Sequence, residues 1–311
     1  MTDNPVEFGR VLITGGGGFI GRHLAAALAP RSTGIVVASR SPGPAACARG
    51  VRSDLTRPGA VRQLLQEFMP TTVFNLAGRR PTRATEEPGA VLELNLRAAI
   101  ELVRESSHLG VRRVILVGSA EEYGEQAMPV SEDAPLKPLT PYGASKAAMT
   151  LQALELHQAT NAPVAVVRPF SVYGPGAPQS MFVAEAAACA ARGAPFQMTD
   201  GMQRRDLIYV TDVVEGLLAA ARAHDAVGKV FNLGSGTSHS MRDVAQTLWR
   251  ISGTSAELQI GARPRLTGDV METRANIDRA RCILGWEPQV GLDEGLQSTW
   301  LAARARNTGE I

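Results

Sequence analysis

The chain has 311 residues, of which 44% are hydrophobic and 20% are charged, and its formal net charge is +2 at pH 7. This length can bury a large core in one large domain or two closely associated ones, and so small a charge gives no reason to expect nucleic acid or a membrane as a partner. No apolar run reaches the ~20 residues of a membrane span, and residues 1–8 lack a basic start and an apolar signal core, so we expect a cytoplasmic protein.

The first predicted element is a strand at residues 11–13, which leads into the sequence TGGGGFIG at residues 14–21 and then into a helix. In this context Gly15 permits a sharp turn, Gly18 leaves room for a pyrophosphate, and Gly21 lets the helix pack closely on the strand. The N–H groups and the dipole at the start of the helix favour phosphate. We therefore predict a dinucleotide site at this turn, with a plain flexible loop as the alternative.

The second predicted strand and its exit cover residues 34–41. A site for NAD usually has Asp or Glu here, about twenty residues beyond the glycines, to hold the ribose hydroxyls. From Arg22 to Ser53 the chain has no acidic residue, and Arg40 directly follows the strand. Arg40 could pair with a 2′-phosphate, so the sequence favours NADP(H) over NAD(H), with a solvated loop arginine as the alternative.

Strands and helices then alternate up to residue 169. The predicted strands are residues 72–78, 111–117 and 164–169, and the predicted helices are residues 61–68, 90–108 and 141–157. This alternation predicts an α/β fold with a Rossmann-type, doubly wound parallel sheet. The polar loop at residues 118–124 follows one of these strands, and such folds place their chemistry at the carboxyl ends of the strands.

The pattern changes after residue 168, where loops, short strands and helices follow without regular alternation. We predict a dinucleotide-binding domain at residues 1–167, with segments that return to it near residues 206–236. Residues 168–311 are expected to form mainly a smaller, mixed α/β substrate-binding lobe. Cys47, Cys189 and Cys282 are far apart and lack the spacing of metal ligands, so we expect no metal site.

Tyr142 and Lys146 lie four residues apart on a predicted helix, so their side chains share one face, although this spacing alone is common. Together with TGGGGFIG and Ser119, the sequence YGASK resembles the extended short-chain dehydrogenase/reductase family, and within it the enzymes that act on nucleotide-diphosphate sugars. The resemblance covers nearly the whole chain. Its motifs are NLAG at residues 75–78, GSAEEYG at 118–124, PYGASK at 141–146, RPFSVYGPG at 168–176, RRDLIYVTDVV at 204–214 and LGWEP at 284–288.

The resemblance implies a role for each matching residue. Tyr142 would be the general acid/base that gives or takes the proton of a sugar oxygen, and Ser119 would hydrogen-bond that oxygen. Lys146 would stay cationic, lower the pKa of Tyr142 and hold the nicotinamide ribose. Further cofactor contacts are implied at Phe19, Ile20, Asp54, Leu55, Leu76, Ala77 and Gly78. Substrate contacts are implied at Glu121, Ser171, Arg205 and Arg265, the two arginines as clamps for the diphosphate.

Two departures from the family pattern narrow the expected activity. Sugar 4,6-dehydratases of this family carry an acid where this chain has Ala120, so dehydration is not expected. Ser171 stands where many relatives place an Asn against the nucleotide diphosphate. The motifs look most like reductases of 4-keto-6-deoxy sugars, such as GDP-4-keto-6-deoxymannose reductases.

We therefore expect NAD(P)H-dependent reduction of the C4 ketone of a nucleotide-diphosphate 4-keto-6-deoxyhexose. An NAD-dependent nucleotide-sugar 4-epimerase is the alternative, against which Arg40 counts because epimerases retain NAD+. A non-catalytic NADP-binding regulator is a third reading, which has no need of Ser119, Tyr142 and Lys146.

The predicted helices at residues 90–108 and 142–157 carry apolar side chains on more than one face. A helix that only covers a sheet needs one apolar stripe, so a second patch predicts a partner. Related enzymes commonly pair these two helices in a four-helix bundle, and we expect a homodimer. The alternative is that the surplus apolar residues pack within the monomer.

Overall fold

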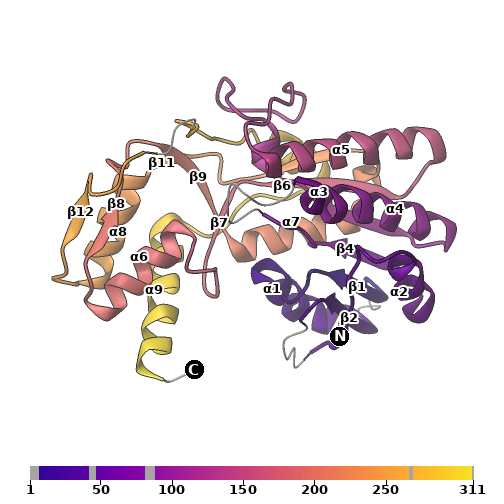
Figure 1. Ribbon diagram of the computed structural model, residues 1–311, viewed down its shortest axis with the longest axis horizontal. Helices are drawn as coiled ribbons and strands as arrows, with labels where there is room; N and C mark the ends of the chain where they lie inside the picture. Colours follow the sequence, from indigo (N-terminus) through magenta and orange to yellow (C-terminus); the bar gives the residue numbers. More distant parts are fainter. Residues whose placement is uncertain (1–6, 42–46, 81–87, 266–268, 310–311) are drawn as a thin grey trace.

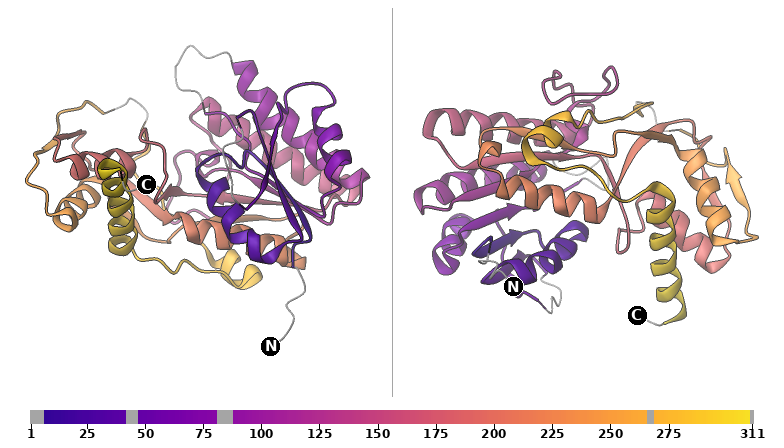
Figure 2. Two further views of the ribbon diagram at one scale, coloured as in Figure 1. Left: turned by 90° about the horizontal axis from the view of Figure 1, so that it is seen from below. Right: turned by 180° about the vertical axis from the view of Figure 1, so that it is seen from behind.

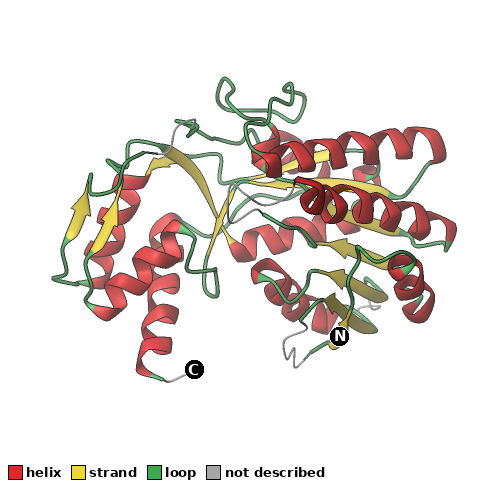
Figure 3. Ribbon diagram, in the orientation of Figure 1, coloured by secondary structure: helices red, strands yellow, loops and turns green. Residues whose placement is uncertain are grey.

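The computed structural model describes residues 7–41, 47–80, 88–265 and 269–309. Its larger part is built on a seven-stranded sheet in which every neighbouring pair of strands is parallel, in the order β10-β6-β5-β4-β1-β2-β3 (Figure 3). The strands are β1 (Arg10–Thr14), β2 (Gly34–Ser39), β3 (Arg49–Arg52), β4 (Thr72–Asn75), β5 (Arg113–Val117), β6 (Val164–Pro169) and β10 (Val230–Leu233).

Helices cover both faces of this sheet (Figure 1). One face packs against α1 (Phe19–Leu28) and α7 (Val210–Arg222), and the other against α2 (Ala60–Phe68), α4 (Ala99–His108) and α5 (Pro141–Thr160). The central strands are therefore buried on both sides, which explains why they are continuous apolar runs rather than alternating patterns. The predicted Rossmann-type fold is confirmed.

The strand order reverses between β1 and β4, where the chain leaves one half of the sheet and begins the other. At this point the carboxyl ends of the two strands are joined by a hydrogen bond from Thr14 Oγ1 to Asn75 Oδ1 of 2.6 Å. Ligands of doubly wound sheets bind in the crevice outside such a switch point. The fold thus places the candidate site at the ends of β1, β4 and β5.

The predicted helix at residues 90–108 is interrupted. It consists of α3 (Pro88–Leu92), a π-helical segment η2 (Glu93–Ala98) and α4. Asn95 lies in the π segment, is fully buried, and hydrogen-bonds the main chain of Arg79 and Ser145 Oγ. The π segment thus coincides with a buried polar contact between the helix, the loop after β4 and α5, and π-bulges inside α-helices are frequent at functional sites.

Several elements were not predicted, and two of them belong to the large sheet and the helices that cover it. Strand β3 lies at the sheet edge and is largely exposed, so it lacks the apolar signal of the other strands. Helix α7 directly follows β9 (Arg204–Tyr209), and the sequence analysis assigned no helix to this segment. Short single-turn segments are η1 (Ala29–Arg31), η3 (Ala120–Glu122), η4 (His224–Ala226) and η5 (Ala280–Leu284).

A smaller lobe follows the carboxyl end of β6 (Figure 2). It contains the sheet β7 (Ser171–Tyr173), β9 and β11 (Ser238–Ser240), the pair β8 (Phe196–Met198) and β12 (Leu258–Ile260), and the helices α6 (Phe182–Arg192), α8 (Met241–Ser252) and α9 (Leu292–Thr308). The lobe has its own apolar core, which includes Phe196 and Leu248. The division of the chain at residues 167 and 168 stays a prediction, while β10 pairs with β6 and so belongs to the large sheet.

Across the described ranges of the chain, no helix is both long and apolar enough to cross a membrane.

Candidate functional site

The glycine turn between β1 and α1 has the geometry of a phosphate cradle. Gly15 has a φ of +68°, and a Cβ there would lie 2.5 Å from the main-chain nitrogen of Ala77, so the turn lies against the end of β4. At Gly21 a Cβ would lie 2.5 Å from Gly16 Cα, so the helix packs closely on the glycine turn rather than on the strand at this residue. Gly18 caps α1 without any side-chain hydrogen bond to the cap, so the first N–H groups of the helix are available to an anion.

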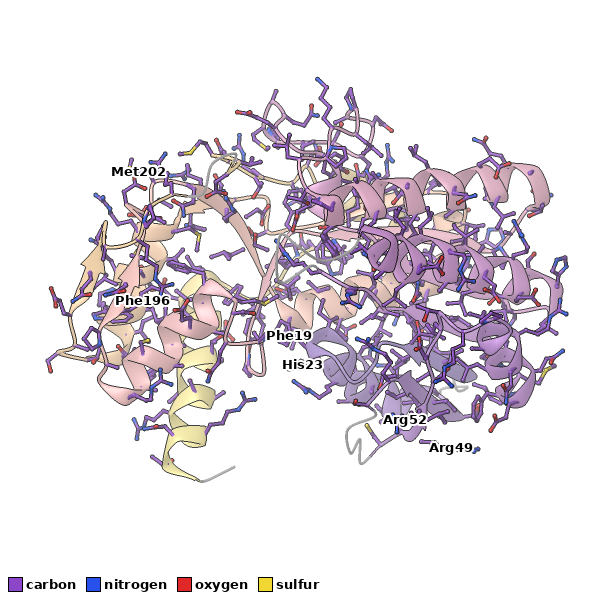
Figure 4. All side chains as sticks on the ribbon, in the orientation of Figure 1. Phe19, His23, Arg49, Arg52, Phe196 and Met202 are labelled. Atoms are coloured by element: carbon purple, nitrogen blue, oxygen red, sulfur yellow. The ribbon has the colours of Figure 1, made fainter. Side chains whose placement is uncertain are left out.

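Helix α1 begins with the predicted cofactor residues Phe19 and Ile20, and its first turns also contact the smaller lobe. Phe19 and His23 lie at the end of α1 nearest that lobe (Figure 4). His23 Nε2 is 2.8 Å from Pro175 O, and Arg22 Nη2 donates to Gly176 O at 3.2 Å. The start of α1, next to the turn that would hold a pyrophosphate, therefore contacts the main chain of the loop after β7.

The end of β2 presents a hydroxyl and a guanidinium where a site for NAD usually has an acid. Ser39 Oγ is buried and has no hydrogen-bond partner in the described part of the chain, and a Cβ at Gly17 of the glycine turn would lie 3.2 Å from it. Arg40 follows and is exposed. Asp54 Oδ1 accepts hydrogen bonds from Thr56 Oγ1 at 2.7 Å and Thr56 N at 3.1 Å, which lower the pKa of the Asp54 carboxyl.

The structure brings Ser119, Tyr142 and Lys146 together at the carboxyl end of β5. Ser119 caps η3, and its side chain lies close enough to the Tyr142 phenol to lower the pKa of that group. Tyr142 and Lys146 lie on the first turns of α5, which Thr140 caps through its hydroxyl. The Lys146 ammonium lies 5.9 Å from the centre of the Tyr142 ring and donates to Val117 O at 2.7 Å.

The remaining predicted cofactor residues follow β3 and β4, and those after β4 approach this group. Ala77 and Leu55 are buried, Leu76 is half-buried, and Gly78 is exposed. A Cβ at Gly78 would lie 3.4 Å from Lys146 Nζ, so the loop after β4 passes directly beside the ammonium. An unpartnered buried hydroxyl at Ser39, the cradle at the glycine turn and the buried ammonium together fit a dinucleotide laid across the switch point.

The electrostatics of the tyrosine differ from the sequence-based prediction. Burial raises the pKa of Tyr142 to about 12, with Glu121 adding to the effect, while Arg80 and Ser119 oppose it. Burial also lowers the pKa of Lys146 to about 8, against the opposing charge of Glu122. The structure therefore differs from the expectation that Lys146 brings the pKa of Tyr142 towards neutral pH, because burial raises this pKa by more than Arg80 and Ser119 lower it.

Glu121 is the only predicted substrate residue that lies beside this group in the described chain, and it is already engaged. Its Oε2 accepts from Thr140 Oγ1 at 2.9 Å, and its Oε1 pairs with Arg80 Nη2 at 2.8 Å. The Arg80 guanidinium lies 5.5 Å from the centre of the Tyr142 ring. Arg80 was not predicted, because nothing in the sequence around it distinguishes it from a solvated arginine.

The two arginines predicted to bind the diphosphate each form a salt bridge with an aspartate. Arg205 pairs with Asp269 at 2.5 Å, and Arg265 pairs with Asp200 at 2.5 Å. Both arginines also contact the segment 269–271, through Val270 O and the sulfur of Met271 respectively, so the structure brings them to one region of the smaller lobe. Ser171 lies half-buried on β7. The substrate roles of all three stay predictions.

A buried ion pair beneath Ser119 was not predicted. Glu122 is fully buried and Arg168 is 2% exposed, and Glu122 Oε2 accepts from Arg168 Nε at 2.7 Å. Arg168 Nη1 donates to Tyr123 Oη at 2.8 Å, and Tyr123 Oη donates to Asn232 Oδ1 at 2.7 Å. The sequence does hold a signal, since Arg168 interrupts an apolar strand, and a charge at such a position needs a buried partner.

No cluster of three or more His, Cys, Asp or Glu side chains able to hold a metal ion occurs among the residues that the structure describes.

Named relatives of this chain act on nucleotide sugars. It is 30% identical to UDP-glucose 4-epimerase of Mycolicibacterium smegmatis, over 93% of this chain and 97% of that protein. It is 29% identical to GDP-6-deoxy-D-mannose reductase of Pseudomonas aeruginosa, over 93% of this chain and 95% of that protein.

Solved structures agree with these relatives. MoeE5 in complex with UDP-glucose and NAD is 32% identical, with a TM-score of 0.87 over 96% of this chain and 99% of that one. RMD from Pseudomonas aeruginosa complexed with NADPH is 27% identical, with a TM-score of 0.82 over 96% of this chain and 99% of that one. The model of the NAD dependent epimerase/dehydratase family matches residues 11–234. The chain thus belongs to the NAD-dependent epimerase/dehydratase family, as an enzyme of the short-chain dehydrogenase/reductase type that modifies nucleotide sugars.

Proposed function

We propose that this enzyme interconverts an alcohol and a ketone at C4 of the sugar of a nucleotide-diphosphate hexose. The observation that carries the proposal is the convergence of Ser119, Tyr142 and Lys146 at the end of β5, beside the glycine turn. Tyr142 transfers the proton at the sugar oxygen, and Ser119 hydrogen-bonds the same oxygen. A nicotinamide dinucleotide, when bound, supplies or accepts the hydride.

The residues that would hold this cofactor follow from their positions. The free N–H groups of α1 and the glycine turn suit the pyrophosphate, and Asp54 with Leu55 suits the adenine end. Lys146, buried beside Gly78, suits the hydroxyls of the nicotinamide ribose. Arg40 and Ser39 suit a 2′-phosphate. We therefore favour NADP(H) for a reaction in which the cofactor dissociates after each turnover.

Within this chemistry, 4-epimerisation of a UDP-sugar is the reaction that the comparisons support better than reduction. UDP-sugar 4-epimerases recur among the matched proteins, and MoeE5 was solved with UDP-glucose and NAD. In an epimerase Tyr142 must first accept a proton from the sugar hydroxyl as a phenolate, and a pKa of about 12 disfavours the phenolate. A positive charge beside the phenol, such as that of an oxidised nicotinamide, would lower this pKa.

Reduction of a 4-keto sugar is the second candidate, and two observations favour it. A neutral Tyr142 next to Glu121 is already in the form that donates a proton to a ketone oxygen. The end of β2 offers Ser39 and Arg40 in place of an acid, which suits NADPH as a reductant. The matched structure of RMD from Pseudomonas aeruginosa was solved with NADPH.

The two candidates are separated with purified protein and two assays. In the first, UDP-glucose and UDP-glucuronic acid are incubated with NAD, and the C4 epimers are quantified by chromatography. In the second, NADPH absorbance is followed with GDP-, dTDP- and UDP-4-keto-6-deoxy sugars. Epimer formation without net change in the cofactor supports epimerisation, whereas stoichiometric NADPH consumption supports reduction. Absence of both reactions, with cofactor binding intact, would overturn the shared proposal.

We also propose a homodimer formed through α4 and α5, as predicted from their sequences. Leu151 on α5 is 59% exposed and Leu92 at the end of α3 is 44% exposed, and such large apolar side chains favour a covered surface. Leu154 packs inward against the core of the large domain, so the surplus apolar surface of α5 is centred on Leu151 rather than on Leu154.

A further inference from the structure

A buried carboxylate and a buried ammonium bind the same short stretch of main chain. Lys146 Nζ donates to the carbonyl of Val117 at 2.7 Å, and Glu122 Oε1 accepts from the N–H of Ser119 at 2.9 Å. Only Gly118 lies between these two main-chain positions, and a Cβ at Gly118 would clash with Glu122 Oε1. The glycine therefore leaves the space in which the carboxylate lies beside the segment that holds Lys146.

The position of the Glu122 carboxylate is fixed from its other side. Glu122 Oε2 accepts from Arg168 Nε at 2.7 Å, and Arg168 is held in turn by Tyr123. Glu122 and Ser119 also form a reciprocal capping box at η3, in which each side chain binds the main chain of the other end. With 0% exposure, the carboxylate has no solvent to screen its charge.

We propose that Glu122 is a positioning residue that acts through Lys146, by supplying the buried negative charge that keeps the Lys146 ammonium protonated. The inference deepens the proposed function, since it rests on Lys146 holding the cofactor as a cation. A lysine fully buried without a counter-charge releases its proton, and a neutral amine would bind ribose more weakly and act less on the tyrosine.

The other groups around Lys146 do not supply such a charge. Gly78 after β4 and the carbonyl of Val117 on β5 are uncharged, as is Asn95 of η2, which binds the neighbouring Ser145. Tyr142 on the same helix is neutral below its raised pKa of about 12. Glu121 faces Tyr142 and is paired with Arg80. Among the described residues, Glu122 is the charge that raises the pKa of Lys146 against the effect of burial.

The composition of the chain makes the test direct, because it has only three lysines, at positions 137, 146 and 229. In a Lys137→Arg, Lys229→Arg background, protein labelled with ¹³C at lysine Cε gives a single lysine signal, which reports the protonation of Lys146 in the free protein. We expect its titration midpoint near the value of about 8 and a fall of about one pH unit or more in Glu122→Gln, since an opposite charge nearby shifts a pKa by roughly 1–3.

The matched control is Glu132→Gln. Glu132 is a second buried carboxylate of the same network, 9% exposed, and it accepts from the main chain of Asn232 rather than from the segment beside Lys146. We expect the Lys146 midpoint to stay at the wild-type value in this variant. An equal fall in both variants would show a general effect of losing a buried acid and would overturn the proposal.

Glu122→Gln leaves Arg168 as an uncompensated buried charge and can prevent folding. The second variant is therefore Glu122→Gln with Arg168→Gln, which removes both charges of the pair. Arg168 binds the carboxylate oxygen that does not contact Ser119, so its removal offsets only part of the effect, and we expect a smaller downward shift. A midpoint at or above the wild-type value in the folded variant overturns the proposal. The measurement needs no substrate, so it stands or fails independently of the reaction catalysed.

Discussion

Replacing Lys146 by Met should change how the stability of the protein depends on pH. Burial depresses the pKa of Lys146 from the usual 10.5 to about 8, which corresponds to about 3 kcal/mol of unfavourable free energy at neutral pH. Between these two values the unfolded chain binds more protons than the folded one, so the free energy of unfolding of the wild type rises with pH. Methionine has a similar volume but no titratable group, so the variant lacks this rise of the free energy of unfolding with pH.

The assay is urea unfolding of both proteins at several pH values, because the tyrosines that titrate at higher pH are common to both and cancel in the difference. Relative to Lys146→Met, the wild type should gain about 2 kcal/mol between pH 7 and pH 9.5. Lys137→Met, at an exposed lysine, is the control and should follow the wild type. A wild-type minus Lys146→Met difference that stays constant across this range would refute the assignment of a depressed pKa to Lys146.

Four further outcomes follow from the described contacts. Tyr142→Phe should keep cofactor binding and lose about 10²–10⁴-fold in turnover, as measured by steady-state kinetics; full activity would remove the phenol from the mechanism. Arg40→Asp should raise the ratio of kcat/KM with NADH to that with NADPH, because a carboxylate repels a 2′-phosphate; an unchanged ratio would contradict the assignment. Gly118→Ala should lower the free energy of unfolding by about 1–3 kcal/mol, since its Cβ overlaps Glu122, and a neutral effect in urea melts would argue against that packing. Leu151→Glu should yield monomers by light scattering if the homodimer forms through α5, whereas a monomeric wild type would exclude the dimer itself.

The sequence predicted the architecture well because its signals are local. The glycine turn lies between an apolar strand and a helix, and each central strand is an apolar run bounded by turns, so the parallel sheet could be inferred from a few residues at a time. The spacing of Tyr142 and Lys146 on one helix is equally local, and the structure places both beside Ser119.

What the sequence could not supply are interactions that depend on the order of strands. Glu122 and Arg168 are 46 residues apart and meet only because β5 and β6 are neighbours in the sheet. The net effect of burial on Tyr142 likewise depends on how much of the surrounding chain covers the phenol, which a motif does not encode. Arg205 and Arg265 were predicted as clamps for the diphosphate, and the sequence did not indicate that each is paired with an acid distant from it along the chain.

The hydrogen bonds between α1 and the loop after β7 would make binding at the two proposed ligand sites thermodynamically dependent. His23 and Arg22 contact the carbonyls of Pro175 and Gly176, so a ligand that ordered the first turns of α1 would also order this loop. Such coupling is reciprocal: whatever the first ligand gains from a preordered loop, the second gains to the same degree. The dinucleotide and the sugar nucleotide would then each tighten the binding of the other, although no side chain of α1 needs to touch the sugar.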